Sequence, residues 1–278
     1  MGDQSLKVKS SSASHVGMVR KLNEDSYISR DEVGLWSVAD GMGGHQAGDM
    51  ASQTVVGALG TVPACPNIHD LLEATRNALN EANSKLIGMD GQFPGGRVPG
   101  STVVVLLITG GQAAVVWAGD SRIYRLRNGI AEQITKDHSH VQELVDQHLI
   151  RPEEAESHPM ANVITRAVGI EEPLETDALL VDVIEGDRFL LCSDGLTRLL
   201  SLEEIQNLMH SQELDEATHT MIHTALIRGA PDNVTVVEVQ CQADGIGAGP
   251  GGVPGSRQGN DPGDDLDDDP DDDKTVVF

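Results

Sequence analysis

The chain is poor in aromatic side chains and cysteines, and each shortage limits the kinds of core, site and compartment that the protein can have. Phe, Trp and Tyr make up 3% of the 278 residues, so Val, Leu, Ile and Ala must fill the core. The 3 cysteines are far apart in the sequence and form no C-x-x-C pair, which argues against a zinc or dithiol site and favours a reducing compartment. Because no apolar run is long enough for a signal peptide or a membrane span, we expect a cytoplasmic protein without membrane contact.

Positive charge is also scarce. The chain has 19 Lys and Arg against 44 Asp and Glu, a net charge of −25, and such a chain repels the phosphate backbone, which argues against a nucleic-acid partner. Residues 241–278 are mostly Gly, Pro and Asp, and they have too little apolar surface to offset the entropy of ordering. We therefore predict one domain over residues 1–240 and a disordered acidic tail over 241–278. The tail is either a solvated segment or a dock for a basic partner or cations.

Short Val-rich and Leu-rich runs bounded by Gly, Asp or Asn predict strands. They cover residues 6–14, 26–30, 35–40, 102–109, 113–120, 122–129, 177–183, 187–194 and 233–240. Apolar residues three and four apart predict helices over 49–62, 68–87, 201–210 and 215–229. Tight connections such as "TGGQ" and "RNG" favour antiparallel meanders. The expected fold class is α+β, antiparallel sheets covered by helices, with 136–170 as a helical and then irregular insertion.

Acidic residues recur at the ends of these predicted strands. They are Asp40, Asp120, Asp194 and Asp232. A single Asp-Gly pair is more often a turn signal, but Asp40 and Asp194 are followed by predicted helices rather than by a second strand. If the strands share one sheet edge, the carboxylates would repel strongly unless cations neutralised them. Ligation by oxygen alone favours Mg²⁺ or Mn²⁺, and the Gly41 carbonyl can approach a metal because glycine has no side chain.

Upstream, "GMVRKLNEDSY" places Arg20 shortly before Glu24 and Asp25. Taken alone, this stretch is equally typical of a surface strand with mixed charges. Beside a metal cleft, however, Arg20 is suited to hold a phosphate through two parallel hydrogen bonds. Glu24 is then placed to hold the water of a metal ion, and Asp25 to support the ligands from behind.

The stretch "CSDGLTR" allows a different chemistry, because Cys192 and Arg198 have the spacing of cysteine phosphatases. That chemistry needs a thiolate of low pKa in a cradle of backbone N–H groups. Here Asp194 would lie inside the cradle and repel the phosphate, and Leu191 stands where such enzymes usually have His. We therefore assign the chemistry to Asp194 and expect Cys192 to be a buried strand residue.

In this order, the blocks "GMVRKLNEDSY", "VADGMGGHQAG", "GSTVVVLL", "WAGDSRIYRLRNG", "LLCSDGLTRLL" and "APDNVTVVEV" resemble the bacterial branch of the PP2C-type metal-dependent serine/threonine phosphatases. The resemblance covers about residues 6–240. It implies a four-layer α-β-β-α sandwich of two antiparallel sheets flanked by antiparallel helix pairs, with a flap over about 136–170 beside the cleft.

The resemblance also implies a role for each site residue. A first Mn²⁺ or Mg²⁺ would be held by Asp40, Asp194 and Asp232. A second would be held by Asp40 and the Gly41 carbonyl, and Glu24 would reach it through water. A third and weaker ion would be held by Asp120 and Asp194. Arg20 would bind the substrate phosphate, and Asp25 and Asn233 would support the ligands. A hydroxide bridging the metals would attack phosphorus directly, without a phosphoenzyme. Met42 stands where eukaryotic members often have a catalytic His, so His45 and a metal-bound water both remain candidates for the general acid.

The partners implied are proteins phosphorylated on serine or threonine and a cognate serine/threonine kinase, with the phosphatase itself a monomer. The alternative is a catalytically silent module that keeps this fold and recruits a partner through its acidic tail. The joint presence of Arg20 and the four strand-end acids favours the enzyme.

Overall fold

The structure, a computed structural model, describes residues 6–44, 46–89, 91–93, 98–155 and 157–243. Two antiparallel sheets form its centre. One has the order β1 (Leu6–His15), β11 (Val234–Ala243), β10 (Arg188–Cys192), β7 (Arg122–Arg127) and β8 (Ile130–Gln133). The other has the order β2 (Asp25–Arg30), β3 (Leu35–Met42), β5 (Val103–Thr109), β6 (Gln112–Ala118) and β9 (Asp177–Asp182), and the short β4 (Gly100–Ser101) pairs with β3.

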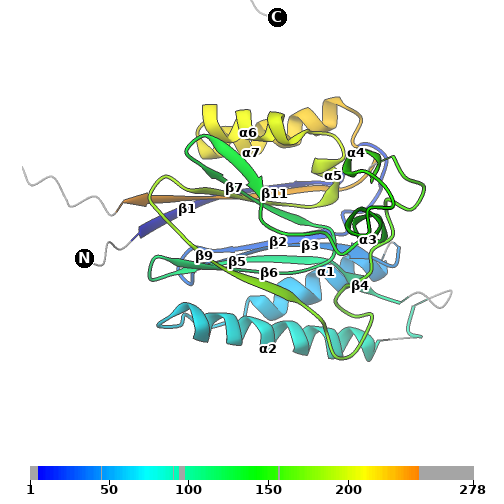
Figure 1. Ribbon diagram of the computed structural model, residues 1–278. Helices are drawn as coiled ribbons and strands as arrows, with labels where there is room; N and C mark the ends of the chain where they lie inside the picture. The colour runs from blue at the N-terminus through cyan, green and yellow to red at the C-terminus, as the bar shows by residue number, and fades with distance from the viewer. Residues whose placement is uncertain (1–5, 45, 90, 94–97, 156, 244–278) are drawn as a thin grey trace, which may run out of the picture. The chain divides into compact units, whose positions relative to one another are not determined.

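Helix pairs cover the outer faces of the two sheets. Helices α1 (Gln46–Leu59) and α2 (Ile68–Ile87) lie on one side of the sandwich, and α6 (Leu202–Ser211) and α7 (Leu214–Ile227) lie on the other (Figure 1). The shorter helices are α3 (His140–Asp146), α4 (Pro152–Ala155) and α5 (Asp194–Thr197). The predicted α-β-β-α sandwich is confirmed.

The buried apolar side chains form three clusters. Trp36 and Phe189 are fully buried between the sheets, among Val and Leu from both. A second cluster packs α1 and α2 against β3 and β5, and a third packs α6 and α7 against β10 and β11. Strand β5, "VVVLLIT", is buried along almost its whole length, because one face meets the other sheet and the other meets helices.

The predicted strand limits are wrong next to three site residues. Strand β6 ends at Ala118 and β10 at Cys192, so Asp120 and Asp194 follow their strands instead of ending them. Strand β3 does not stop at Asp40 but continues to Met42, because Gly41 and Met42 pair with Ser101 and Gly100 of β4. Strands β4 and β8 and helix α5, between two and four residues long, were not predicted, since such short elements give no measurable periodicity. Asp40 therefore lies on a paired strand and is held by backbone hydrogen bonds.

An ion pair is buried beneath the α6 and α7 layer. The side chain of Arg188 on β10 is 9% exposed and that of Glu238 on β11 is fully buried, with Nη2 and Oε1 2.5 Å apart. Arg188 also donates a hydrogen bond of 2.8 Å to the carbonyl of Gln212. Burial raises the pKa of Glu238 to about 7, and the charge of Arg188 opposes this rise.

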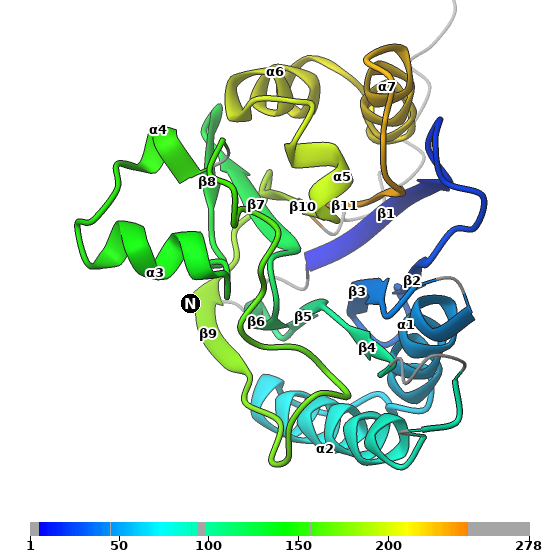
Figure 2. The same cartoon turned by 90° about the vertical axis from the view of Figure 1, so that its right-hand side faces the viewer.

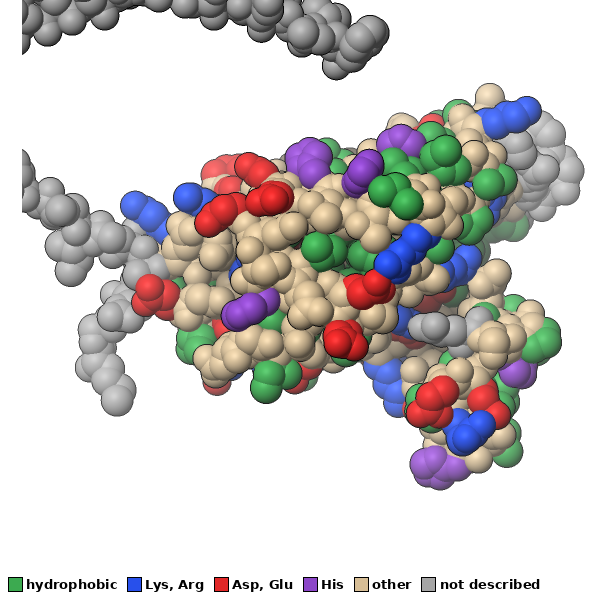
Figure 3. All heavy atoms as spheres, turned by 90° about the horizontal axis from the view of Figure 1, so that it is seen from above, with side chains coloured by type: hydrophobic (Ala, Val, Ile, Leu, Met, Phe, Trp, Pro, Cys, Tyr) green, Lys and Arg blue, Asp and Glu red, His purple; other side chains and the backbone are tan. Residues whose placement is uncertain are grey.

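Residues 136–170 contain α3 and α4 and project from the body of the sandwich. The lobe is visible in Figure 3, which views the molecule from the side covered by α6 and α7. The acidic tail was predicted over 241–278, but its first three residues belong to β11, which continues to Ala243 because it pairs with β1 along its whole length. The rest of the predicted tail and the candidate general acid His45 lie outside the described residues. No helix in the described ranges has the length and apolar character needed to cross a bilayer.

Candidate active site

The four strand-end acids come from different elements that meet at one end of the sandwich (Figure 2). Asp40 lies near the end of β3, Asp120 follows β6, Asp194 begins α5 directly after β10, and Asp232 precedes β11. The charges of Asp120, Asp194 and Asp232 all act on the Asp40 carboxyl and raise its pKa. The structure thus brings together residues up to 192 positions apart in the chain.

Asp25 lies behind this group, opposite Asp40 in the β2–β3 register. Its Oδ2 accepts hydrogen bonds from Ser193 Oγ at 2.8 Å and from Thr235 Oγ1 at 2.7 Å. The second carboxyl oxygen, Oδ1, is buried without a hydrogen bond from any residue that the structure describes. Burial raises the pKa of Asp25 to about 7 against those two hydrogen bonds. The Asp25 carboxyl is therefore fixed through Oδ2, while Oδ1 remains available as a hydrogen-bond acceptor.

Burial and mutual repulsion raise the pKa of the neighbouring carboxyls as well. The pKa of Asp40 lies well above its ordinary value, first through burial and then through the Asp25 charge. The pKa of Asp120 rises to about 7 through burial and the charge of Asp194. Burial also raises the pKa of Asp194, although Arg198 opposes the rise. The group holds more negative charge than its surroundings neutralise.

Two arginines supply part of the missing positive charge. Arg20 Nη2 lies 2.7 Å from Asp232 Oδ2, with side chains 49% and 26% exposed, and Arg198 forms an ion pair with Asp194 one helical turn earlier. Arg20 thus links its own loop to the residues that directly precede β11. No three Asp, Glu, His or Cys side chains in the described ranges are grouped tightly enough to hold an ion as they stand.

Glycines let the backbone segments of the site approach each other. Gly41 donates a hydrogen bond of 3.0 Å to the Glu24 carbonyl, and a Cβ atom on Gly41 would overlap the carbonyl oxygen of Gly48 on α1. A Cβ atom on Gly195 would overlap the carbonyl oxygen of Asn233. These contacts are between backbones, which cannot yield as a flexible side chain would, so both positions require glycine.

The donor set fits a hard dication. Asp40, Asp120, Asp194 and Asp232 offer carboxylate oxygens, and Gly41 offers a carbonyl with no side chain to shield it. Carboxylate and carbonyl oxygens are the ligands that Mg²⁺ and Mn²⁺ prefer. A bound dication would also remove the repulsion that raises the pKa values of these acids.

Cys192, the alternative nucleophile, is fully buried in β10. Burial raises the pKa of its thiol to about 12, whereas a nucleophilic cysteine needs a lowered pKa and access to substrate. The expectation that Cys192 is a buried strand residue is confirmed.

Sequence reasoning missed three side chains that hold the carboxylates in place. The sequence pattern suggested Arg198 only as a partner of Cys192, although its spacing of four residues from Asp194 at a helix start predicts an ion pair. Ser193 and Thr235, which hold Asp25, are small hydroxyl residues at strand ends, and nothing in the sequence distinguishes them from ordinary strand positions.

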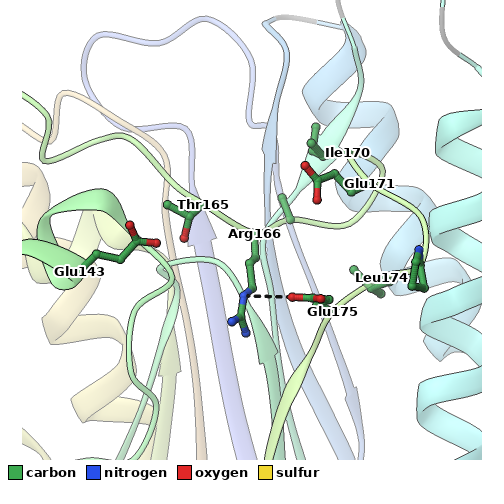
Figure 4. Close-up of a pocket in the computed structure, with 9 residues that line it drawn as sticks. Glu143, Thr165, Arg166, Ile170, Glu171, Leu174 and Glu175 are labelled. Atoms are coloured by element: carbon green, nitrogen blue, oxygen red, sulfur yellow. Dashed lines mark ion pairs between the residues drawn. The ribbon is translucent and has the colours of Figure 1, made fainter. Parts of the chain in front are cut away.

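Two cavities, each of about 140 Å³, lie beside the segment 136–170. One reaches Asp120, Asp194 and Arg198, and Gln142 and Asn162 line its opposite wall. The other, shown in Figure 4, is lined by residues from Glu143 to Glu175, with none of the four strand-end acids among them. The first cavity is therefore the one that adjoins the strand-end acids, through Asp120 and Asp194.

In the second cavity, Arg166 extends toward Glu175, at an N–O distance of 3.7 Å (Figure 4). Its Nη1 also lies 2.9 Å from Asp177 at the start of β9. His138, stacked on Trp117 with ring centroids 6.0 Å apart, approaches the same carboxylate at 3.3 Å. These contacts tie both ends of the segment 136–170 to the sheet.

The raised pKa values predict how pH changes the stability of the metal-free protein. Asp120 binds its proton more tightly when folded, with a pKa of about 7 against an ordinary value of 3.8. Its contribution to the free energy of unfolding is therefore complete below pH 3.8 and is lost as pH rises through about 7. Urea unfolding in EDTA at several pH values, compared with Asp120→Asn, will measure it. We expect the wild type to lose stability relative to the variant over this range, and a constant difference would contradict the prediction.

Comparison with known proteins identifies the family. A family model described as protein phosphatase 2C matches residues 14–233. The serine/threonine protein phosphatase PstP of Mycobacterium tuberculosis is 40% identical over 237 residues, which are 85% of this chain and 46% of PstP, so the chain spans about half the length of that curated relative.

Solved structures agree in sequence and in fold. The structure of PppA, described as a key regulatory component of T6SS in Pseudomonas aeruginosa, is 44% identical, with a TM-score of 0.78 over 84% of this chain and 97% of the other. The catalytic domain of PstP in complex with 2 manganese ions is 38% identical, with a TM-score of 0.75 over 86% of this chain and 100% of the other. Family model, sequence relatives and fold thus agree with the resemblance seen in the sequence, and this chain belongs to the protein phosphatase 2C family.

Proposed function

We propose that the protein hydrolyses phosphoserine and phosphothreonine in other proteins with the help of bound Mn²⁺ or Mg²⁺. The observation that carries the proposal is the convergence of Asp40, Asp120, Asp194 and Asp232 at one end of the sandwich, with Arg20 at the same place. This end also contains the cavity that adjoins the strand-end acids. Its carboxylate and carbonyl donors suit two core ions and a third, weaker one.

Each residue has a distinct task in this proposal. The first core ion would be held by Asp40, Asp194 and Asp232. The second would be held by Asp40, the Gly41 carbonyl and, through water, Glu24, and the third by Asp120 and Asp194. Bound divalent cations make a coordinated water acidic and neutralise charge on the phosphoryl group. Asp25 supports the site from behind through the hydroxyls of Ser193 and Thr235, and Asn233 holds the backbone of the Arg20 loop in place.

Arg20 is the group of the chain that meets the substrate phosphate. Its guanidinium is half exposed and close to Asp232, so a phosphate entering the cleft can accept two parallel hydrogen bonds from it. If Asp232 held a metal ion, the guanidinium of Arg20 would exchange that carboxylate for the substrate phosphate. Arg20 would then bind and orient the phosphate beside the residues that hold the metals.

The cellular setting follows from the same chemistry. A phosphoprotein phosphatase acts against a serine/threonine kinase, and we propose a cognate kinase as the functional partner. We also propose that the protein is a monomer and that it is cytoplasmic. The free thiols of Cys65, Cys192 and Cys241 support the cytoplasmic setting, since thiols persist in reducing compartments.

Hydrolysis of a phosphothreonine peptide and of p-nitrophenyl phosphate, measured with Mn²⁺ and with EDTA, tests the proposed function. We expect turnover of both compounds with Mn²⁺, loss of turnover in EDTA and recovery when Mn²⁺ is added in excess. An absence of turnover in the presence of Mn²⁺ would favour the silent binding module.

A further inference from the structure

The loop between β1 and β2 exposes three large apolar side chains at the edge of the active site. Met18 is 63% exposed, Val19 is 67% exposed and Leu22 is 42% exposed. Figure 2 shows this loop on one side of the end of the sandwich, with α3 and α4 on the other side. Single exposed apolar side chains are normal on a protein surface, but several gathered beside a cleft are typical of a binding site.

Hydrogen bonds to the backbone, rather than apolar packing, hold this loop. The side chain of Asn233 donates from Nδ2 to the carbonyls of Val16, at 2.9 Å, and Leu22, at 3.0 Å. Its Oδ1 accepts from the Glu24 amide at 2.8 Å, and the Met18 amide donates to the Ala230 carbonyl at 2.8 Å. Asn233 is 4% exposed and thus fastens both ends of the loop from inside.

A loop fixed in this way presents its apolar side chains in a preset arrangement. Binding to a surface that is already ordered avoids the entropy loss of ordering it at that moment. Gly17 makes the arrangement possible, because its φ of +81° is in the left-handed region and a Cβ atom there would overlap the Asp232 carbonyl oxygen.

The phosphate ligand of the proposed function belongs to the same loop. Arg20 follows Val19 directly, and its guanidinium lies 2.7 Å from Asp232. Consecutive Cα atoms are about 3.8 Å apart, and an extended substrate advances about 3.3 Å per residue. An apolar side chain within three residues of a phosphate bound to Arg20 can therefore reach Met18 or Val19.

The charge of the loop selects the same kind of partner. Arg20 and Lys21 are adjacent cations in a chain of net charge −25, so the loop attracts an anionic segment that the rest of the chain repels. A second copy of this chain fits less well, because a stable dimer needs about 800 Å² of contact from each partner, far more than three side chains provide.

We propose that Met18, Val19 and Leu22 form a docking surface for the phosphoprotein substrate, and that this surface selects segments with an aliphatic or aromatic residue within three positions of the phosphoserine or phosphothreonine. The inference rests on the proposed function and adds a substrate preference to it. Asn233 is the positioning residue that holds the surface beside the metal centre.

The test uses the full chain with Mn²⁺ and the double variant Met18→Ser/Val19→Ser, whose positions are exposed and make no core contact. The substrates are two phosphothreonine peptides of equal length and charge, one flanked by Leu and the other by Ser, and p-nitrophenyl phosphate, which has no flanking residues. The matched control is Ile130→Ser/Ile227→Ser, at residues 69% and 73% exposed at the start of β8 and at the end of α7.

We expect the wild type and the control to favour the Leu-flanked peptide by about tenfold in kcat/KM, a typical ratio for small apolar contacts. The double variant should lose this preference through a higher KM and should hydrolyse p-nitrophenyl phosphate at the wild-type rate. A preference that survives in the double variant, a wild type without one, or an equal loss on all three substrates would each overturn the inference.

Sedimentation of the wild type provides a second criterion. A dimer that the double variant disrupts, with peptide preference unchanged, would assign the surface to a second copy and overturn the substrate proposal. Failure of the proposed function itself would look different, since the wild type would then hydrolyse none of the three substrates.

Discussion

Replacing Asp194 with Asn lowers kcat/KM for a phosphothreonine peptide by about a thousandfold or more. Asp194 contributes to both the core and the third ion in the proposed site, and a bound metal supplies several kcal/mol of charge stabilisation in the transition state, with each 1.36 kcal/mol worth about tenfold in rate. The asparagine has the same shape but one charge fewer, so the fold is retained. Steady-state kinetics with Mn²⁺ measures the loss of activity, and titration calorimetry measures the weakened binding of Mn²⁺.

Two controls separate this effect from a general disturbance. Asp215→Asn removes a carboxylate from the exposed face of α7 and should leave kinetics and metal binding unchanged. Cys192→Ser, two residues from Asp194, should keep phosphatase activity, because the thiol is buried with its pKa raised to about 12. An active Asp194→Asn variant together with an inactive Cys192→Ser variant would restore the thiol mechanism.

Replacing Arg188 with Met destabilises the protein by about 3–5 kcal/mol, the usual effect of removing one partner from a buried ion pair. Glu238 is fully buried, and without Arg188 its negative charge has no compensating cation. The variant can avoid this charge only by keeping Glu238 protonated. Because the pKa of Glu238 is already about 7 with Arg188 present, the destabilisation should be larger at pH 8 than at pH 5.

Urea unfolding at both pH values measures this effect. The double variant Arg188→Met/Glu238→Leu should recover most of the lost stability, since it leaves no charge in the core. Equal destabilisation at the two pH values, or a double variant no more stable than Arg188→Met, would show that packing rather than charge determines the stability of this layer.

The carboxylate positions could be predicted from the sequence because each acid follows or precedes an apolar run that is readable by itself. The layers could be predicted because their main elements are also readable by themselves. Helix α2 has a strong periodicity, and strand β5 has a strong apolar character, over many residues. Strands β4 and β8 were missed because two or four residues carry no pattern.

Interactions between distant parts of the chain could not be predicted in the same way. Arg20 and Asp232 are 212 positions apart, and Asn233 contacts backbone carbonyls at Val16 and Leu22 that carry no sequence signal at all. Such contacts depend on how the two sheets stack, which the sequence determines only through the whole core. The unpredicted extension of β3 beyond Asp40 has a similar origin, because it depends on pairing with β4.

Strand β11 lies between β1 and β10 in its sheet, although it is the last strand along the chain, and Asp232 and Asn233 directly precede it. During translation, β1 therefore cannot pair with β11 until more than 230 residues have been made. A nascent polypeptide interrupted before residue 232 lacks one carboxylate, the asparagine that fastens the Arg20 loop, and an interior strand of one sheet. Under the proposed function, such a fragment would lack part of the metal site, so hydrolysis would require the completed sandwich.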